Sequence, residues 1–316
     1  MNAFYDLASL AKPLVTAPLA LAFLDLDADR RWALGFHDRD VPLTVRQLLS
    51  HGSGLPPWRP FTGEPVAAQL RRGVPDHPLL RPATGGLATY SDLNYRLLAE
   101  LLEAETGAPL PLLGAALGLS PAPWQDAPVE LPDGPDARAW ALAAGTPPPP
   151  RDPQLPHDCN ARAGMRGHAG FGSSAPRLRA ALDRWVASGW PGHMAVETAE
   201  GEHGTRWGLG LQALFAGAGH FGQLLSKIPP GAGTQVIEDG AQADSPAAPG
   251  PEAESPSGWW YHLAFTGPAL FYRPSDRCCI GLLLHRQGPA GELLEAEALR
   301  ARRWRALAGF VGQFGG

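Results

Sequence analysis

The chain has 316 residues, of which 44% are apolar and 18% are charged, and its formal net charge is -5 at pH 7. This length and composition suit an enzyme-sized globular protein with one sizeable core, or two that share an interface. The chain has no long basic run, so we expect no nucleic-acid partner, and its three cysteines are too few for a disulfide framework and fit a reducing compartment.

The first predicted element is a helix over residues 10–24. Its apolar stretch is too short to span a bilayer and runs into acidic residues without a small-residue cleavage site. We therefore expect no membrane segment and a cytoplasmic protein, with a signal upstream of Met1 as the alternative. Pro18 lies deep in this helix and is expected to kink it.

Three further helices are predicted in the first two thirds of the chain, over residues 43–50, 92–105 and 175–188. The clearest is 92–105, in which leucines form an apolar stripe, Ser91 or Asp92 caps the start and Gly107 ends the helix. Residues 108–156 are punctuated by prolines and are expected to cross the surface with short helices.

Antiparallel strands are predicted in the last third, where short apolar segments alternate with turn residues. These segments are 207–215, 259–265, 269–273 and 278–285. Residues 217–258 are rich in Gly, Pro, Ala and Ser and predict a flexible loop, and a final helix is expected over 291–311.

The order of these elements predicts an α+β fold in one domain with two subdomains. Residues 25–205 would form a mostly helical subdomain, inserted into a sheet-bearing subdomain made of residues 1–24 and 206–316. We find no internal repeat.

Ser9 and Lys12 are the first candidates for chemistry. A spacing of three places both side chains on one face of a helix, and Pro13 favours a helix start, where the helix dipole stabilises an oxyanion. Only two of the 26 basic residues are lysine, and lysine, unlike arginine, can give up its proton when it is desolvated. The alternative is a capping serine beside a lysine that packs along the surface.

Four further motifs follow in chain order. They are Leu48 to Pro56, Tyr90-Ser91-Asp92, Asn160-Ala161-Arg162 with Gly167 to Gly170, and His262 to Gly267. With Ser9 and Lys12, they make the chain resemble the serine β-lactamases, penicillin-binding proteins and related esterases, closest to the class C β-lactamase-like branch. The resemblance covers residues 4–106 and 157–290, and it implies a β-lactamase/transpeptidase-like fold with an antiparallel sheet flanked by helices.

The resemblance also implies roles for single residues. Ser9 would be acylated, Lys12 would accept its proton, and Tyr90 would share that proton and activate the deacylating water. The backbone amides of Ser9 and Phe265 would form the oxyanion hole, and Thr266 would lie on its substrate side. The alternative for Tyr90 is an interface tyrosine with a satisfied hydroxyl.

Two departures from the family pattern bear on activity. Asp92 replaces the usual asparagine, so a negative charge would favour the protonated form of Lys12. His262-Leu263-Ala264 replaces Lys-Thr-Gly, which removes a substrate carboxylate contact and narrows the strand edge. The histidine is familiar in esterase-like members, and we place His262 among the catalytic residues.

The other candidates have plainer interpretations. His51 and His168 lie in Gly-rich turns and are expected to be structural hydrogen-bonding residues. His157 and Cys159 lack the spacing of a metal site, and we expect neither metal nor cofactor. Residues 259–261 would form either strand core or a wall facing substrate.

The predicted function is hydrolysis of an ester, amide or β-lactam-like carbonyl of a small-molecule or peptide-like substrate through an acyl-enzyme. The alternative is an inactive penicillin-binding-like module that binds a peptide, a cell-wall fragment or a partner. Only eight residues precede Ser9, so the family's N-terminal strands are expected to be missing and strand 278–285 to become an apolar edge. Upstream sequence, another segment or a second copy in a homodimer would then cover it.

Overall fold

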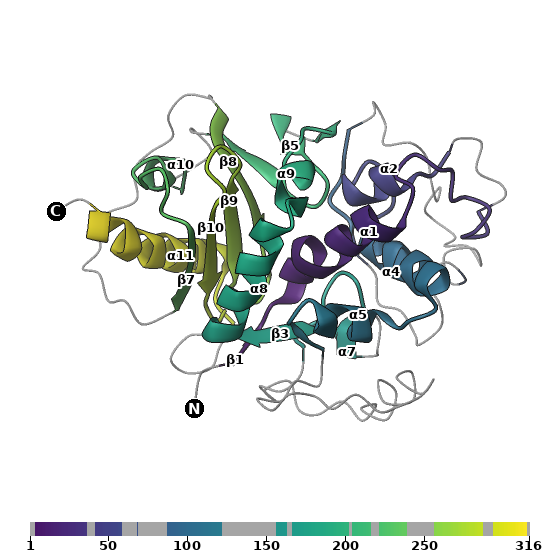
Figure 1. Ribbon diagram of the computed structural model, residues 1–316, viewed down its shortest axis with the longest axis horizontal. Helices are drawn as coiled ribbons and strands as arrows, with labels where there is room; N and C mark the ends of the chain where they lie inside the picture. The colour runs from purple at the N-terminus through teal and green to yellow at the C-terminus, as the bar shows by residue number, and fades with distance from the viewer. Residues whose placement is uncertain are drawn as a thin grey trace.

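The computed structural model describes ten stretches of the chain (Figure 1). They are residues 4–36, 42–58, 68, 87–121, 156–162, 166–201, 204–215, 221–238, 256–286 and 293–314. The parts of 108–156 and 217–258 that fall between these stretches lie outside the described residues. Within the described stretches, no helix is both long and apolar enough to cross a membrane.

The larger sheet has seven strands in the order β4-β5-β6-β8-β9-β10-β7. They are β4 (Ala199–Glu200), β5 (Arg206–Trp207), β6 (Gln212–Phe215), β7 (Thr234–Glu238), β8 (Pro256–Leu263), β9 (Ala269–Arg273) and β10 (Cys278–Leu283). All neighbouring pairs are antiparallel except β10 and β7. The sheet confirms the strands predicted in the last third, although the segment 207–215 splits into β5 and β6.

The expectation of an exposed edge at residues 278–285 is wrong. Strand β10 pairs with β9 on one side and, in parallel, with β7 on the other, with Gly281 opposite Val236. Strand β7 comes from the stretch 217–258, which was expected to be one flexible loop and which also contains helix α10 (Phe221–Leu225). Another segment of the same chain therefore covers β10, and a homodimer is not needed for this purpose.

The sheet separates two clusters of buried side chains, as the period of two in a strand requires. Cys279 belongs to one cluster with Tyr272 and Trp260, whereas Cys278 belongs to the other with Phe271 and Trp259. Helix α8 (Ala175–Ala187) covers the first face, and α10 and α11 (Ala296–Val311) cover the second (Figure 1). Trp259 and Trp260 are thus core residues.

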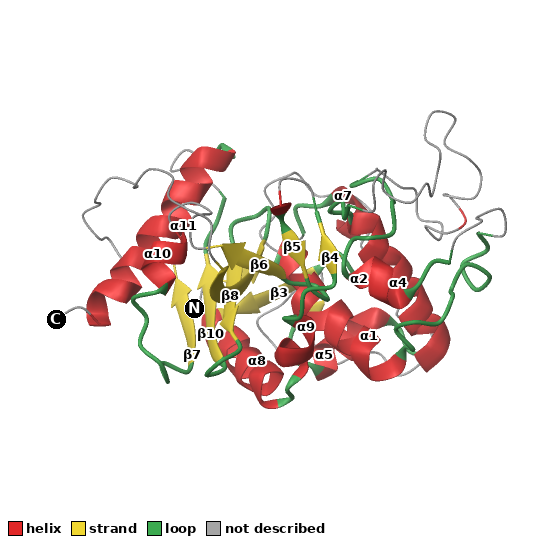
Figure 2. Ribbon diagram, turned by 90° about the horizontal axis from the view of Figure 1, so that it is seen from above, coloured by secondary structure: helices red, strands yellow, loops and turns green. Residues whose placement is uncertain are grey.

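The remaining helices of the described stretches lie on the side of the sheet away from α10 and α11, toward the right in Figure 2. They are α1 (Ala17–Phe23), α2 (Val45–Leu49), α4 (Asp92–Thr106), α5 (Leu110–Ala116) and the short α7 (Cys159–Arg162) and α9 (Trp190–Met194). A capping box formed by Thr44 and Gln47 starts α2, and Gly107 ends α4 in the left-handed conformation, at φ 68°. The predicted helices 43–50, 92–105, 175–188 and 291–311 are confirmed with small changes at their ends.

The predicted helix 10–24 is not one regular helix. A 3-10 turn, η1 (Ala8–Leu10), leads into a π-helical stretch, η2 (Lys12–Thr16), and α1 starts only at Ala17. Pro13 and Pro18 lie within the first two positions of η2 and α1. Because proline has no amide hydrogen, each is tolerated at such a start, so Pro18 marks a break between two helical forms.

A small sheet in the order β1-β3-β2 connects the N-terminus to the middle of the chain. It consists of β1 (Phe4–Asp6), β2 (Ser120–Pro121) and β3 (Phe171–Ser174), and a final turn η4 (Gly312–Phe314) follows α11. Strand β1 leads directly into the turn that carries Ser9. The division into subdomains at residues 24 and 205 remains a prediction.

Candidate active site

Ser9 lies in the tight turn η1 between β1 and the π-helical stretch. Ala8, directly before it, has φ +40°, a backbone conformation that costs a residue with a Cβ about 1 to 3 kcal/mol unless its surroundings hold it. The Ala8 amide donates to the Asp6 Oδ1 at 2.8 Å. The nucleophile candidate is therefore carried by a strained turn that a side chain fixes.

Lys12 is completely buried and contacts Ser9. Its Nζ donates to the Ser9 Oγ at 3.0 Å and to the backbone oxygen of His168 at 3.2 Å. It also forms an ion pair with the Asp92 Oδ1 at 2.7 Å. A buried ammonium requires such partners, because burying an unpaired charge costs several kcal/mol.

Tyr90 reaches the same serine from the start of α4. Its hydroxyl donates to the Ser9 Oγ at 3.1 Å, and the Lys12 Nζ lies 5.0 Å from the centroid of its ring. The Ser91 hydroxyl donates to the backbone oxygen of Pro56 at 2.7 Å and so joins this start to the segment 48–56. Ser9, Lys12, Tyr90 and Asp92, which are spread over more than 80 residues of sequence, thus form one contact network.

The electrostatics of this network favour protonated groups. Burial lowers the pKa of Lys12, but the charge of Asp92, with Tyr90 and their hydrogen bonds, outweighs it, so that the pKa lies above its usual 10.5. Burial also raises the pKa of Tyr90, against the opposing effect of Lys12. At neutral pH, Lys12 is thus an ammonium and Tyr90 a phenol.

His262 lies behind Tyr90, with 6.1 Å between the ring centroids. It is buried, shares a hydrogen bond of 3.0 Å between its Nδ1 and the backbone oxygen of Gly210, and does not line the cavity described below. Burial, followed by the charge of Lys12, lowers its pKa to about 3. The imidazole is therefore neutral, and Nδ1 carries the proton that the carbonyl accepts.

His51 is a second neutral, buried histidine near Tyr90. Its Nδ1 accepts from the Ser91 amide at 3.1 Å, and burial lowers its pKa well below 6.5. Its backbone is left-handed, with φ 62°. These contacts position the start of α4 and agree with the structural role expected for this residue.

A cavity of about 650 Å³ opens at Ser9. Its walls come from distant parts of the chain and carry both apolar and polar side chains. They include Trp58, Tyr90, Ala169, Leu263, Ala264, Phe265, Thr266, Arg286 and Leu299. This volume suits a small or medium-sized organic substrate.

Phe265 and Thr266 follow β8 and form one side of this cavity. The Phe265 ring is half exposed and carries the Arg286 guanidinium at 4.0 Å from its centroid. The Thr266 hydroxyl donates to the backbone oxygen of Asp6 at 2.8 Å. Leu263 and Ala264, in place of the family's threonine and glycine, line the same side.

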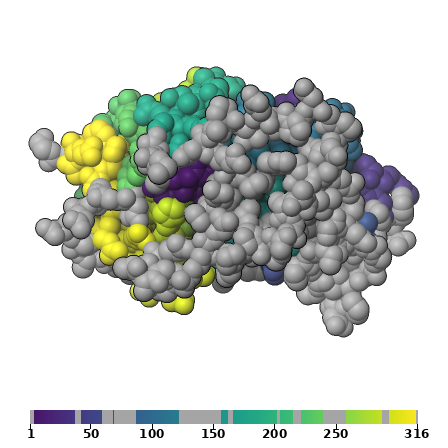
Figure 3. Space-filling model, turned by 90° about the horizontal axis from the view of Figure 1, so that it is seen from below, coloured from purple at the N-terminus to yellow at the C-terminus, as the bar shows by residue number. Residues whose placement is uncertain are grey.

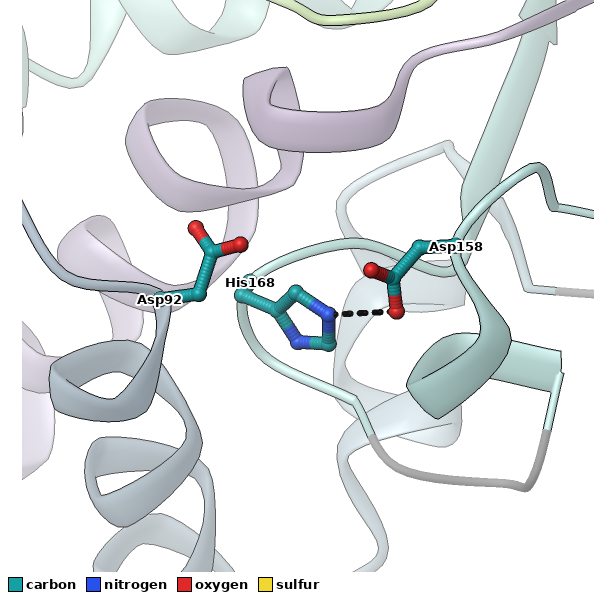
Figure 4. Close-up of side chains that lie close together, drawn as sticks. All are labelled: Asp92, Asp158 and His168. Atoms are coloured by element: carbon teal, nitrogen blue, oxygen red, sulfur yellow. Dashed lines mark hydrogen bonds and ion pairs between the residues drawn. The ribbon is translucent and has the colours of Figure 1, made fainter. Parts of the chain in front are cut away.

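Asp158 is a cavity residue that the sequence analysis did not single out. Its carboxylate bonds the His168 Nε2 at 2.9 Å (Figure 4) and accepts from the Trp58 Nε1 at 3.1 Å. These bonds and the Ala161 amide hold its pKa below the usual range, although burial opposes them. The pairing joins residues 58, 158 and 168, so no local spacing predicts it.

Asp92, Asp158 and His168 bring potential metal ligands within 4.8 Å of one another. Figure 4 shows Asp158 and His168 joined directly, and the Asp92 Oδ1 is paired with Lys12. Protein contacts thus account for the cluster, which does not by itself indicate a metal site.

Comparisons with known proteins bear on the family and the fold of the chain. A family model described as Beta-lactamase matches residues 2–303. No curated protein matches the chain significantly.

Several solved structures share the fold at low sequence identity. A class C β-lactamase from Rhodobacter sphaeroides has a TM-score of 0.60 at 18% identity, over 100% of this chain and 86% of that one. EstCE1, a hydrolase with promiscuous acyltransferase activity, has a TM-score of 0.57 at 18% identity, over 97% of this chain and 85% of that one. A D-amino acid amidase from Ochrobactrum anthropi SV3 has a TM-score of 0.53 at 16% identity, over 99% of this chain and 85% of that one.

Proposed function

The chain belongs to the β-lactamase family, and from this premise we propose that it is a serine acyl hydrolase. Ser9 attacks an ester or amide carbonyl and forms an acyl-enzyme, which water then hydrolyses. One observation carries the proposal: the Ser9 Oγ, at the edge of the cavity, is contacted by both the Lys12 Nζ and the Tyr90 hydroxyl.

The ion pair between Lys12 and Asp92 sets the proton balance of the first step. Lys12 must lose one proton, to Asp92 or to solvent, before its free amine can accept the proton of Ser9. The Ser9 oxygen then adds to the carbonyl, and the leaving group takes the proton as its bond to the carbonyl carbon breaks. The backbone amides of Ser9 and Phe265 stabilise the oxyanion in this scheme.

Esters are the substrate class that we propose. The cavity wall carries Leu263 and Ala264, which offer neither the hydroxyl nor the open edge that a β-lactam carboxylate would use. Trp58, Ala169, Phe265 and Leu299 add further apolar surface to the lining, which suits the acyl group of an ester. The EstCE1 hydrolase and the D-amino acid amidase, which share the fold, make an ester or amide a reasonable choice.

Kinetics with matched variants test this proposal. A short-chain nitrophenyl ester should give a higher kcat/KM than a penicillin. Lys12→Arg keeps the charge but cannot supply a free amine, so it should lower kcat by at least about a hundredfold. Lys227→Arg makes the same replacement at an exposed lysine and serves as the control. Unchanged turnover in Lys12→Arg would refute the role of Lys12, and a clear preference for penicillin would refute the ester assignment.

The second candidate is an inactive binding module, which the ion pair between Lys12 and Asp92 favours. This candidate requires that the wild-type protein release no product from any ester, amide or penicillin at any pH while it still binds a cell-wall peptide. Product release abolished by Ser9→Ala would exclude it.

A further inference from the structure

Asp6, the last residue of β1, joins three segments that are distant in sequence. Its Oδ1 accepts from the Ala8 amide at 2.8 Å, and its Oδ2 accepts from the His157 amide at 2.9 Å. Its backbone oxygen accepts from the Thr266 hydroxyl at 2.8 Å. One residue thus makes a hydrogen bond to the nucleophile turn, to the segment before α7 and to the turn after β8.

These three segments are walls of the cavity. Ala8, His157 and Thr266 all line it, whereas Asp6 does not. In the view from below, the purple N-terminal residues lie beside residues of the C-terminal third (Figure 3). The Tyr5 ring stacks on the His285 ring there, with 4.5 Å between the ring centroids. Asp6 therefore acts on the cavity through its neighbours.

Two amide hydrogens converge on this one side chain, so the two oxygens of a carboxylate suit the place. An asparagine offers one acceptor oxygen, and its amide nitrogen would have to face the second N–H as donor to donor. The side chain also holds Ala8 at φ +40°, and Ala8 directly precedes Ser9. A change at residue 6 is thus transmitted to the Ser9 Oγ through one strained residue.

The carboxylate is not favourable for folding. Burial, with a smaller contribution from Asp158, raises the pKa of Asp6 to about 6, although the two amide bonds lower it. Because the pKa of Asp6 is higher in the folded than in the unfolded protein, folding favours the neutral acid. This contribution to stability is present at low pH and is lost as the pH rises through about 6. A neutral residue of the same shape avoids this penalty at pH 7, and this gain offsets the donor-to-donor contact that an asparagine introduces.

We propose that Asp6 is a positioning residue of the active site, an inference that rests on the proposed function. Its carboxylate and backbone oxygen clamp the nucleophile turn, residue 157 and the turn 265–266 together. The clamp fixes the Ser9 Oγ relative to the Phe265 amide, across the place where the carbonyl of a substrate is attacked. Loss of one clamp bond moves reacting atoms apart without removing a group that touches substrate.

The test compares Asp6→Asn with the wild-type protein and with Asp183→Asn, an isosteric change at an exposed residue of α8. Misplacement of reacting atoms by about 1 Å can cost a hundredfold in rate. We expect Asp6→Asn to lower kcat for a nitrophenyl ester, and the rate of Ser9 phosphonylation by a fluorophosphonate, about 10- to 100-fold. KM should stay within about twofold, and Tm at pH 7 should not fall. Wild-type rates in Asp6→Asn would overturn the inference, and so would a loss of rate fully matched by a loss of folded protein.

A second pair of variants tests the third clamp bond. Thr266→Val removes the hydroxyl at nearly constant volume, and Thr266→Ser restores it. The valine variant should lose rate and the serine variant should regain most of it. Equal rates for the two variants would show that the hydrogen bond from Thr266 to Asp6 does not affect the rate.

Hydrogen exchange keeps this inference separate from the proposed function. If the fluorophosphonate leaves wild-type Ser9 unmodified, the proposed function fails, but amide exchange of residues 7–12, 156–161 and 264–268 still measures the clamp. Faster exchange in all three segments of Asp6→Asn, but not of Asp183→Asn, supports the clamp. Unchanged exchange contradicts it.

Discussion

At the residue scale, one substitution in the family pattern dominates the chemistry. Asp92 stands where an asparagine is usual, and its Oδ1 lies 2.7 Å from the Lys12 Nζ. The ion pair keeps a fully buried lysine charged, against the effect of burial on its pKa. The free amine that would accept the proton of Ser9 is therefore scarce at neutral pH.

This ion pair predicts an alkaline activity profile. Because the pKa of Lys12 is raised, kcat/KM for an ester should increase with pH through and beyond pH 9. Asp92→Asn removes the charge while burial remains, so the pKa of Lys12 should fall and the rising limb should move down by about 1 to 3 pH units. At pH 7 the kcat/KM of Asp92→Asn should then exceed that of the wild-type protein by about tenfold or more.

The exposed pair of Asp27 and Arg46 provides a control for this profile. Asp27→Asn changes the net charge by the same amount far from Ser9 and should leave the profile in place. If kcat/KM rises over the same pH range in Asp92→Asn and in the wild-type protein, the free amine of Lys12 does not limit the reaction.

The sequence analysis named the residues of this cluster, which the structure brings into contact and whose catalytic roles remain predictions. The spacing of Ser9 and Lys12 and the ordered motifs pointed to the residues that meet at the cavity. The bonds of Asp158 to Trp58 and of Asp6 to His157 were not predictable, because each joins residues at least 100 positions apart. The place of His262 behind Tyr90 depends on the Gly210 carbonyl, which no motif indicates.

At the element scale, strand β7 is the main departure from expectation. Its residues Thr234 to Glu238 lie in a stretch whose composition is typical of a loop, and a parallel partner leaves no local signature in sequence. The strands with apolar runs bounded by turns, such as β9 and β10, were predictable because burial on both faces shows in their composition.

The pairing of β7 predicts the protection of β10. Its backbone amides should exchange as slowly as those of β9, because both its edges are bonded. Val236 lies 3.7 Å from the position of a Cβ built on Gly281, beside leucines of α8. Val236→Asp should therefore cost about 2 to 4 kcal/mol of unfolding free energy and speed exchange in β10.

Glu238→Gln, at the exposed end of β7, is the matched control and should change stability by no more than about 0.5 kcal/mol. Fast exchange of alternate β10 amides in the wild-type protein would show that this edge is open in solution.

At the scale of the whole molecule, the cavity lies where the N-terminal turn, the start of α4, the segment around residue 158 and the turn after β8 meet. Cys159 is exposed and belongs to this lining, whereas Cys278 and Cys279 are buried in the sheet. Burial raises the pKa of Cys278 to about 11 and that of Cys279 well above 9.

This distribution predicts that the folded protein reacts with one equivalent of a thiol reagent. A bulky maleimide on Cys159 should obstruct the cavity and lower ester turnover at least about tenfold, whereas Cys159→Ser should keep its activity and resist the reagent. Full turnover after complete labelling of Cys159 would place substrate elsewhere.

The central proposal, acylation of Ser9, is tested most directly by intact mass and peptide mapping after exposure to a fluorophosphonate. We expect one phosphonyl adduct on Ser9 in the wild-type protein and none in Ser9→Ala, with a rate that increases with pH and is faster at pH 7 in Asp92→Asn. An adduct of equal yield in Ser9→Ala, or a wild-type protein left unmodified up to pH 10 while it remains folded, would contradict the assignment.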